Sequence, residues 1–316
     1  MSGRVLVPWK NVIDELSDGG ALRAAGLTAE VFTGDEPGPA DLDDVVFFTV
    51  PYDRPFGLEP LPRLAGVRVV QALTAGYDHL LPKLSGDVVL CNARGLHDSG
   101  TAELALALIL AAQRELARWV RAQDEGRWEH AHTKSLAESR VLIVGYGSIG
   151  ESLDARLRAC EASTVRVARR PRPDSGVHGV AGLDDLLPSA DVVVLVTPLS
   201  EETRGLLDAR RLALLPDGAL VVNVGRGAVL DTDAMVAEAL SGRLRAALDV
   251  TDPEPLPEGH PLWHCPGVLI TPHVAGGAAD FYPKAGRFIA SQIRHFAAGE
   301  PLRNVVAGPG HHGVRK

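Results

Sequence analysis

The sequence has few cysteines, few aromatic residues and no excess of positive charge. Of its 316 residues three are cysteines, Cys91, Cys160 and Cys265, and they stand far apart. This argues against a disulfide framework or a zinc site and favours a reducing, cytoplasmic environment. Aromatic residues make up 5% of the chain and the formal net charge is -8, so broad binding to nucleic acid is not expected.

Long apolar runs are also missing. The longest one, LALALILAA at residues 104–112, is much shorter than the roughly 20 residues that a membrane-spanning helix needs. The first residues, MSGRVLVPWK, show no apolar run behind a basic region and do not read as a secretory signal. No cluster of metal ligands is visible. We therefore expect a soluble protein without a membrane partner and without a metal.

Short valine-rich segments alternate with helical patterns along the chain. In the first part, strand-like segments stand at residues 4–8, 44–50, 67–73 and 87–92, and a long helical pattern follows at residues 101–125. A second series begins with RVLIVG and continues through TVRVA, DVVVLVT, ALVVNVG, RAALDV and GVLITPH. Strands that alternate with helices form doubly wound parallel sheets, so the sequence predicts an α/β fold with two Rossmann-like domains.

A glycine-rich turn follows the first strand of the second series. The segment GYGSIG stands between RVLIV and the helical pattern SLDARLRA. Glycines in this context allow a tight turn and the close approach of a pyrophosphate, whose charge meets the N–H groups of the helix start. The sequence therefore predicts a dinucleotide site at Gly145, Tyr146, Gly147, Ser148, Ile149 and Gly150.

The next strand ends without the acidic residue that would bind the adenosine ribose of NAD. Ala168 stands there instead, followed by Arg169 and Arg170. An acid would bond the ribose 2'-hydroxyl and repel the additional phosphate of NADP, whereas guanidinium groups match a phosphate in geometry and charge. We therefore predict that NADP is preferred over NAD; the alternative is that the arginines form a solvated loop.

Polar residues follow three later strands. Arg226 comes after ALVVNVG, Glu254 lies in a proline-rich loop after the strand that ends at Asp249, and His273 ends GVLITPH. Open α/β sheets bind their ligands at the carboxyl ends of the strands. Each residue alone could be an ordinary surface arginine, loop carboxylate or buried histidine, but together they predict a catalytic site.

Taken together, these segments resemble the D-isomer-specific 2-hydroxyacid dehydrogenase family. The resemblance covers nearly the whole chain and includes TAGYDHL, TAELALALIL, GYGSIG, VTPLSEETRGLLD, NVGRGAVLD, ALDVTDPEPLP and LITPHVAGG. It implies a dinucleotide-binding domain at residues 98–282, inserted in a substrate-binding domain at residues 1–97 and 283–316. It also implies a cleft between the domains and, usually, a homodimer.

The family resemblance implies a reaction as well. A hydride passes between NAD(P)H and a small 2-keto acid such as glyoxylate or hydroxypyruvate, which becomes a D-2-hydroxy acid. Arg226 would hold the substrate carboxylate and carbonyl, His273 would act as general acid and base, and Glu254 would orient the imidazole. Further positions implied by the resemblance are Thr101, Thr197, Pro198, Thr203, Val224 and Asp249 at the cofactor, and Ala75, Gly76 and Tyr52 at the substrate.

Some features leave other interpretations open. A formate-type dehydrogenase is disfavoured, because that branch of the superfamily has Gln at the position where this chain has Glu254. A phosphite-type dehydrogenase shares the Arg, Glu and His, and a dinucleotide-sensing corepressor also keeps them. The chain departs from the family pattern at Asp154, a helix position that is more often apolar. His97, His130 and His132 are expected to be surface histidines.

Overall fold

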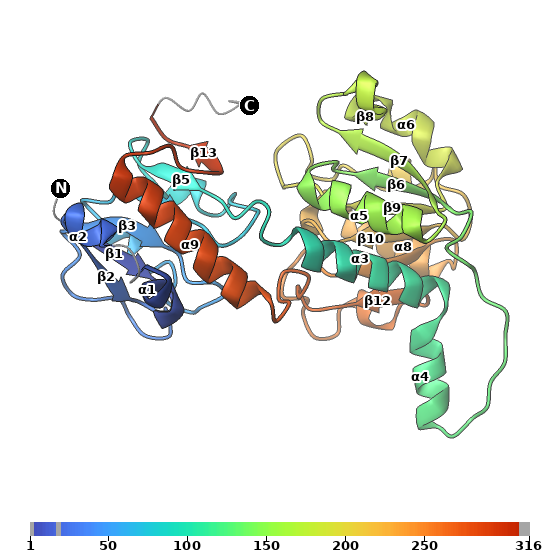
Figure 1. The fold of residues 1–316 in the computed structure, drawn as a ribbon. Helices are drawn as coiled ribbons and strands as arrows, with labels where there is room; N and C mark the ends of the chain where they lie inside the picture. The colour runs from blue at the N-terminus through green and yellow to red at the C-terminus, as the bar shows by residue number, and fades with distance from the viewer. Residues whose placement is uncertain (1–2, 17–19, 310–316) are drawn as a thin grey trace. The chain divides into compact units, whose positions relative to one another are not determined.

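The computed structural model describes residues 3–16 and 20–309, which divide into two compact units (Figure 1). Met1–His97 and Ala279–Lys316 form the first unit, and Asp98–Ala278 form the second. The second unit is thus a continuous insertion in the chain of the first. Its end at Ala278 falls before the expected boundary at residue 282.

The first unit is built on a six-stranded sheet in the order β13-β5-β4-β3-β1-β2. All strand pairs are parallel except β13 with β5. Successive side chains of a strand point to opposite faces, so Val5 packs with helix α9 while Leu6 packs in the cluster on the other face. The elements are β1 (Gly3–Val7), α1 (Lys10–Leu16), α2 (Ala21–Ala24), β2 (Leu27–Val31), β3 (Val45–Thr49), β4 (Val69–Gln71), β5 (Val89–Cys91), α9 (Phe281–Ala298) and β13 (Val305–Ala307).

The second unit is built on a seven-stranded parallel sheet in the order β12-β11-β10-β9-β6-β7-β8. From β6 the chain runs outward to β7 and β8, then crosses to β9 on the other side. Such a reversal of strand order is where open α/β sheets bind ligands. The elements are α3 (Asp98–Gln113), α4 (Leu116–Asp124), β6 (Arg140–Val144), α5 (Ser148–Ala159), β7 (Ser163–Ala168), β8 (Val177–Gly179), α6 (Leu183–Leu186), β9 (Val192–Leu195), α7 (Ala209–Leu212), β10 (Leu220–Asn223), α8 (Thr232–Leu240), β11 (Arg245–Leu248) and β12 (Val268–Ile270).

Apolar clusters cover both faces of this parallel sheet. Residues of α3 and α5 pack on one face, and residues of α6, α7 and α8 pack on the other. Burial on both faces explains why its strands read as continuous valine-rich runs. The predicted α/β class with two Rossmann-like sheets is confirmed, with one antiparallel edge strand in the first unit.

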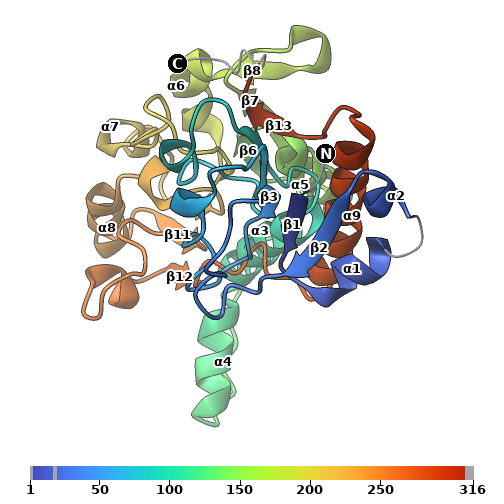
Figure 2. The same cartoon turned by 90° about the vertical axis from the view of Figure 1, so that its left-hand side faces the viewer.

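The helix expected at residues 101–125 is interrupted. Glu115 has a left-handed backbone with φ of 50°, which ends α3 and turns the chain into α4. The indole N–H of Trp119 donates to the Arg114 carbonyl oxygen at 2.7 Å and fixes this change of direction. In Figures 1 and 2, α4 projects away from the sheet of its own unit. Within residues 3–16 and 20–309, every helix is too short or too polar to span a lipid bilayer.

Candidate functional site

The glycine turn after β6 contains two glycines that the fold itself requires. Gly145 has φ of +115°, and a Cβ there would lie 2.5 Å from the Val196 carbonyl oxygen. A Cβ on Gly150 would lie 2.4 Å from the Gly145 carbonyl oxygen. At Gly147, by contrast, no atom lies within 4 Å of the Cβ position, so this glycine leaves open surface where α5 begins.

A dinucleotide pyrophosphate fits this turn. Helix α5 starts at Ser148 without a side-chain cap on its first N–H groups, which suits the binding of an anion. Beside the turn, the hydroxyl oxygen of Thr197 is buried and has no hydrogen-bond partner among the described residues. Buried hydroxyls are normally bonded, so this one is available to a ligand. The open face of Gly147 and the unpartnered hydroxyl of Thr197 lie where a cofactor was expected from the sequence.

The other expected cofactor positions are hydrogen-bonded or buried within the protein. Thr203 closes the loop after β9, because its hydroxyl donates to the Pro198 carbonyl oxygen at 2.8 Å. Thr101 and Val224 are buried, at 4% and 7% exposure. Ser148 donates its hydroxyl to the Asp98 carboxylate at 3.1 Å. These contacts place the residues in the second unit and leave their cofactor contacts as predictions.

The strand β7 ends at Ala168, and Arg169 and Arg170 follow it into solvent. Neither arginine makes a hydrogen bond or ion pair within the described part of the chain. Arg172, which carried no assignment in the sequence, instead turns back to the glycine turn and donates to the Tyr146 carbonyl oxygen at 2.5 Å. The run of arginines in the printed sequence was the only indication of this contact.

His273 and Glu254 form a direct pair. Nδ1 of His273 lies 2.5 Å from Oε1 of Glu254. The backbone of His273 is left-handed, with φ of 52°, a conformation that costs a residue with a side chain roughly 1–2 kcal/mol. Such residues gather at functional sites, where the surrounding structure holds them in place. The imidazole is 47% exposed and can meet a ligand.

Asp249 holds the His273 segment in that conformation. Its carbonyl oxygen accepts from the His273 N–H at 2.8 Å. Its carboxylate accepts from the Thr271 hydroxyl at 2.6 Å and from the N–H groups of Val274 and Ala275, each at 3.0 Å. The family resemblance implies that Asp249 lies at the cofactor. The structure adds that this buried carboxylate brackets the histidine on both sides.

Arg226 is held by the loop that follows β10. The Asn223 side-chain amide donates to the Arg226 carbonyl oxygen at 2.9 Å, and Arg226 Nη1 donates to the Gly225 carbonyl oxygen at 2.8 Å. A Cβ on Gly227 would lie 1.9 Å from the Thr251 carbonyl oxygen, so only glycine fits beside the arginine. Because β10, β11 and β12 are adjacent, Arg226, Glu254 and His273 all follow strands at one edge of the sheet.

The expected substrate residues lie in the first unit. The side-chain amide of Asn92 donates to the Ala75 carbonyl oxygen at 2.7 Å. The Thr74 hydroxyl donates to the Gly76 carbonyl oxygen at 2.5 Å. The ring of Tyr52 packs against Phe281, with ring centroids 4.7 Å apart. The contacts order these residues without testing their role.

One histidine was misjudged from the sequence. His97, expected at the surface, is 6% exposed and its Nε2 lies 2.6 Å from the Leu73 carbonyl oxygen. It stacks on Phe281, with centroids 4.8 Å apart, so aromatic packing buries it. His130 and His132 are exposed.

Comparison with known proteins decides the family. Residues 106–275 match the NAD-binding domain of the D-isomer-specific 2-hydroxyacid dehydrogenases. The chain belongs to this family. Over 70% of its own length, this member of the family is 33% identical to a D-3-phosphoglycerate dehydrogenase of Archaeoglobus fulgidus. That alignment covers only 43% of the relative, so the chain spans less than half of this longer protein.

Solved structures of similar dehydrogenases cover the chain almost completely. A D-isomer-specific 2-hydroxyacid dehydrogenase from Xanthobacter autotrophicus, in complex with NADPH and MES, is 34% identical, with a TM-score of 0.78 over 96% of this chain and 98% of that one. An NADPH-dependent glyoxylate/hydroxypyruvate reductase from Sinorhizobium meliloti, in complex with NADP and sulfate, is 27% identical, with the same TM-score and coverage. The expected family is confirmed.

Proposed function

We propose that this dehydrogenase reduces a small 2-keto acid, such as glyoxylate or hydroxypyruvate, to the D-2-hydroxy acid. The observation that carries the proposal is the His273–Glu254 pair, whose residues follow β12 and β11, the strands next to β10, which precedes Arg226. The similarity to a glyoxylate/hydroxypyruvate reductase of Sinorhizobium meliloti supports the substrate class.

Each of the three residues has a separate part in the reaction. The guanidinium of Arg226 offers a fork of N–H donors to the substrate carboxylate and carbonyl. Because Nδ1 of His273 is bound to Glu254, Nε2 is the nitrogen left to give a proton to the carbonyl oxygen in reduction and to take it back in oxidation. A bound nicotinamide supplies the hydride in this chemistry.

We also propose that NADP is the preferred cofactor. Gly147, the start of α5 and the Thr197 hydroxyl would hold the pyrophosphate end. Ala168 replaces the acid that would repel a 2'-phosphate, and Arg169 and Arg170 have no partner among the described residues to compete for it. The related structures in complex with NADPH and NADP support this choice.

Initial rates test both parts of the proposal. The full-length protein would be assayed with glyoxylate, hydroxypyruvate and phenylpyruvate, each with NADPH and with NADH. We expect turnover that is faster with NADPH. Faster turnover with NADH would remove the cofactor assignment and keep the reaction. Oxidation of phosphite, or no turnover together with a stable transcription-factor partner, would replace the proposed function by one of its alternatives.

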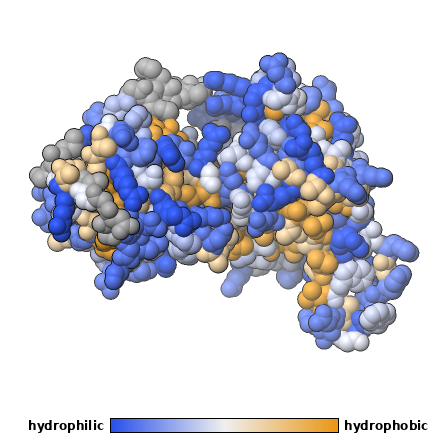
Figure 3. Space-filling model, in the orientation of Figure 1, coloured by the Kyte–Doolittle hydropathy of each residue, from blue (hydrophilic) through white to orange (hydrophobic). Residues whose placement is uncertain are grey.

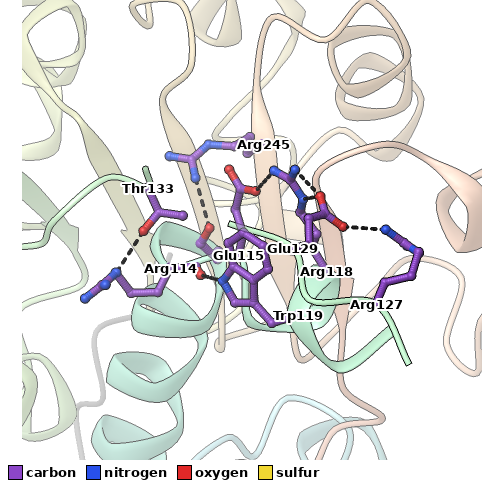
Figure 4. Close-up of polar contacts among 9 residues, drawn as sticks. Arg114, Glu115, Arg118, Trp119, Arg127, Glu129, Thr133 and Arg245 are labelled. Atoms are coloured by element: carbon purple, nitrogen blue, oxygen red, sulfur yellow. Dashed lines mark hydrogen bonds and ion pairs between the residues drawn. The ribbon is translucent and has the colours of Figure 1, made fainter. Parts of the chain in front are cut away.

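We propose further that two copies of the chain associate through α4. Apolar side chains are exposed along this helix and the segment after it: Leu116 is 49% exposed, Val120 56% and Trp128 100%. The helix and the segment after it are nevertheless held in place by ion pairs. Arg118 binds Glu115 at 2.8 Å and also pairs with Glu129, which fixes the returning segment (Figure 4). Exposed apolar surface on an ordered element is typical of an interface.

A groove beside α4 offers the matching surface. It has a volume of about 650 Å³ and is lined by the edge strand β12, Trp263, Arg121 and Arg245. The Arg245 guanidinium donates hydrogen bonds to neutral oxygens, among them the Gln113 side-chain oxygen at 2.6 Å. The exposed carboxylate of Asp124, near the end of α4, has the complementary charge. Figure 3 shows hydrophobic surface in this region, which a second copy would cover by a reciprocal contact.

A further inference from the structure

We infer that Asp154 positions Arg172 against the glycine turn, through Tyr146, and that Arg172 is a determinant of binding to the 2'-phosphate of NADP. The inference rests on the proposed cofactor preference and adds to it two residues that carried no cofactor role: the buried Asp154 and the third arginine of the ARRPR segment. The family pattern does not account for Asp154, since that helix position is more often apolar.

The backbone of Arg172 is fixed although it lies between β7 and β8. Its N–H donates to the Val177 carbonyl oxygen at 2.8 Å, and the Val177 N–H donates back to the Arg172 carbonyl oxygen at 3.1 Å. This pair of bonds forms an antiparallel bridge between the two residues. The backbone position of Arg172 is therefore fixed, whereas the backbones of Arg169 and Arg170 make no such bridge in the described part of the chain.

The side chain of Arg172 is held across the glycine turn by three contacts. Nη2 donates to the Tyr146 carbonyl oxygen at 2.5 Å, and the guanidinium carbon lies 5.4 Å from the centre of the Tyr146 ring. Nη1 lies 3.6 Å from Oε1 of Glu151 in the first turn of α5. A cation over an aromatic face is attracted by the ring quadrupole, so the ring serves as a platform for the arginine. The side chain is still 43% exposed, which leaves donors for a ligand.

Asp154 fixes the platform from below. Its side chain is fully buried, and its carboxylate accepts from the Tyr146 hydroxyl at 2.7 Å and from the Thr164 hydroxyl at 2.5 Å. Burial, followed by this hydrogen bond to Asp154, raises the pKa of the Tyr146 hydroxyl. An apolar residue at position 154 would leave the tyrosine hydroxyl without this acceptor, and the ring would lose its fixed orientation.

The same carboxylate balances the positive charge around the ring. A second guanidinium, that of Arg166, also lies 5.4 Å from the centre of the Tyr146 ring. Its Nε is 3.2 Å from Oδ2 of Asp154, close enough for an ion pair although the N–H is not aligned for a hydrogen bond. Two arginines over one ring repel each other unless anions are near, and Asp154 and Glu151 supply them. The cluster is thus built to keep Arg172 in place next to the phosphate-binding turn.

The experiment compares two adenosine fragments that differ by the 2'-phosphate. Calorimetry would measure the dissociation constants of 2',5'-ADP and 5'-AMP for the full-length protein, so the readout does not depend on turnover. Replacing Arg172 by Ala should weaken 2',5'-ADP about 10- to 100-fold, as expected for one charge-assisted contact, and leave 5'-AMP nearly unchanged. The control is Arg158→Ala, since Arg158 lies 3.3 Å from the Asp154 carboxylate and makes no stacking contact with Tyr146.

Two more variants test the positioning role. Asp154→Asn and Tyr146→Phe should each reduce the discrimination between the fragments, and Asp154→Asn should also lower the pKa of Tyr146 in an ultraviolet titration. If Asp154→Asn does not fold, Tyr146→Phe decides, because it removes only the hydroxyl. Full discrimination in Tyr146→Phe would overturn the role of Asp154, and full discrimination in Arg172→Ala would overturn the role of Arg172.

The failure of this inference differs from a failure of the cofactor proposal. Wild-type protein that binds both fragments equally would contradict the NADP preference itself and the inference with it. Wild-type protein that discriminates, with Arg172→Ala unchanged, would leave the preference to Arg169 and Arg170 and overturn the inference alone.

Discussion

The pair of His273 and Glu254 is the smallest unit on which the proposed chemistry depends. The 2.5 Å contact between them directs one nitrogen of the ring and leaves the other for the substrate. The bonds from Asp249 keep the backbone of His273 in a conformation that the residue would not adopt alone. The direction of the ring therefore follows from its surroundings as much as from its own identity.

Replacing His273 by Ala should abolish most turnover, since the loss of a general acid costs about 10²- to 10⁴-fold in rate. Cofactor binding should stay nearly intact, because the glycine turn lies on another part of the sheet. Steady-state rates and a fluorescence titration with NADPH measure the two effects separately. Loss of cofactor binding with normal residual turnover would show that the role of His273 is wrong.

Replacing Arg169 by Asp should shift the preference of the enzyme toward NAD. The new carboxylate would repel a 2'-phosphate and could bond the ribose 2'-hydroxyl. The ratio of kcat/KM for NADPH to that for NADH would be compared with the ratio in wild type. An unchanged ratio would mean that Arg169 takes no part in cofactor choice and would leave that choice to Arg170 and Arg172.

At this scale, residue identities were easier to predict than their contacts. Arg226, Glu254 and His273 could be selected because each follows an apolar strand within a recognisable segment. The contact of Arg172 with Tyr146 could not, since a loop arginine has no preferred direction in sequence. The same holds for Asp154: its burial depends on β7, which packs over α5 from a later part of the chain.

Among the elements, the glycine turn and the start of α5 contain both a glycine that the fold requires and a glycine that the fold does not require. A Cβ on Gly150 would lie 2.4 Å from the backbone oxygen of Gly145, whereas a Cβ on Gly147 would meet no atom within 4 Å. One position is restricted by the protein, and the other is open on the side where the cofactor was expected.

Substituting Ala at these two glycines should therefore have opposite effects. Gly150→Ala should destabilise the protein by about 1–3 kcal/mol, the usual range for overpacking, and lower the midpoint of thermal unfolding. Gly147→Ala should leave the midpoint nearly unchanged and weaken NADPH binding. Calorimetric scans and cofactor titrations measure both quantities. Equal midpoints for the two variants would contradict this account of the turn.

The break between α3 and α4 shows where periodicity is insufficient. The helical pattern of residues 101–125 continues through Glu115, and no glycine or proline marks the left-handed residue. The break depends on the bond from Trp119 to Arg114 and on the ion pairs of Arg118, which form only after the chain has turned. Strand positions were more predictable, because valine-rich runs buried on both faces have few alternatives.

For the whole molecule, two sheets built mainly of parallel strands could be predicted from alternation alone, whereas the return of α9 to the first unit came from the family resemblance. Alternation is a local property of the sequence. The pairing of β13 with β5 joins segments from opposite ends of the chain and has no local pattern. The homodimer is likewise a prediction from the family resemblance, and its location at the exposed face of α4 is our proposal.

Replacing Val120 by Glu should convert the homodimer into monomers, because a charge would enter the apolar contact. Leu240→Glu is the matched control: Leu240 ends α8 and is 60% exposed, against 56% for Val120. Sedimentation velocity over a range of concentrations measures the mass of each protein. A monomeric wild type, or a Val120→Glu variant that sediments as a dimer, would contradict association through α4.

The product of the reaction is the most direct test of the central claim. The full-length protein would be incubated with hydroxypyruvate and NADPH, and the product would be separated by chiral chromatography. The account predicts the D-2-hydroxy acid, formed in step with the oxidation of NADPH. An L-2-hydroxy acid, or oxidation of NADPH without a hydroxy acid, would contradict it.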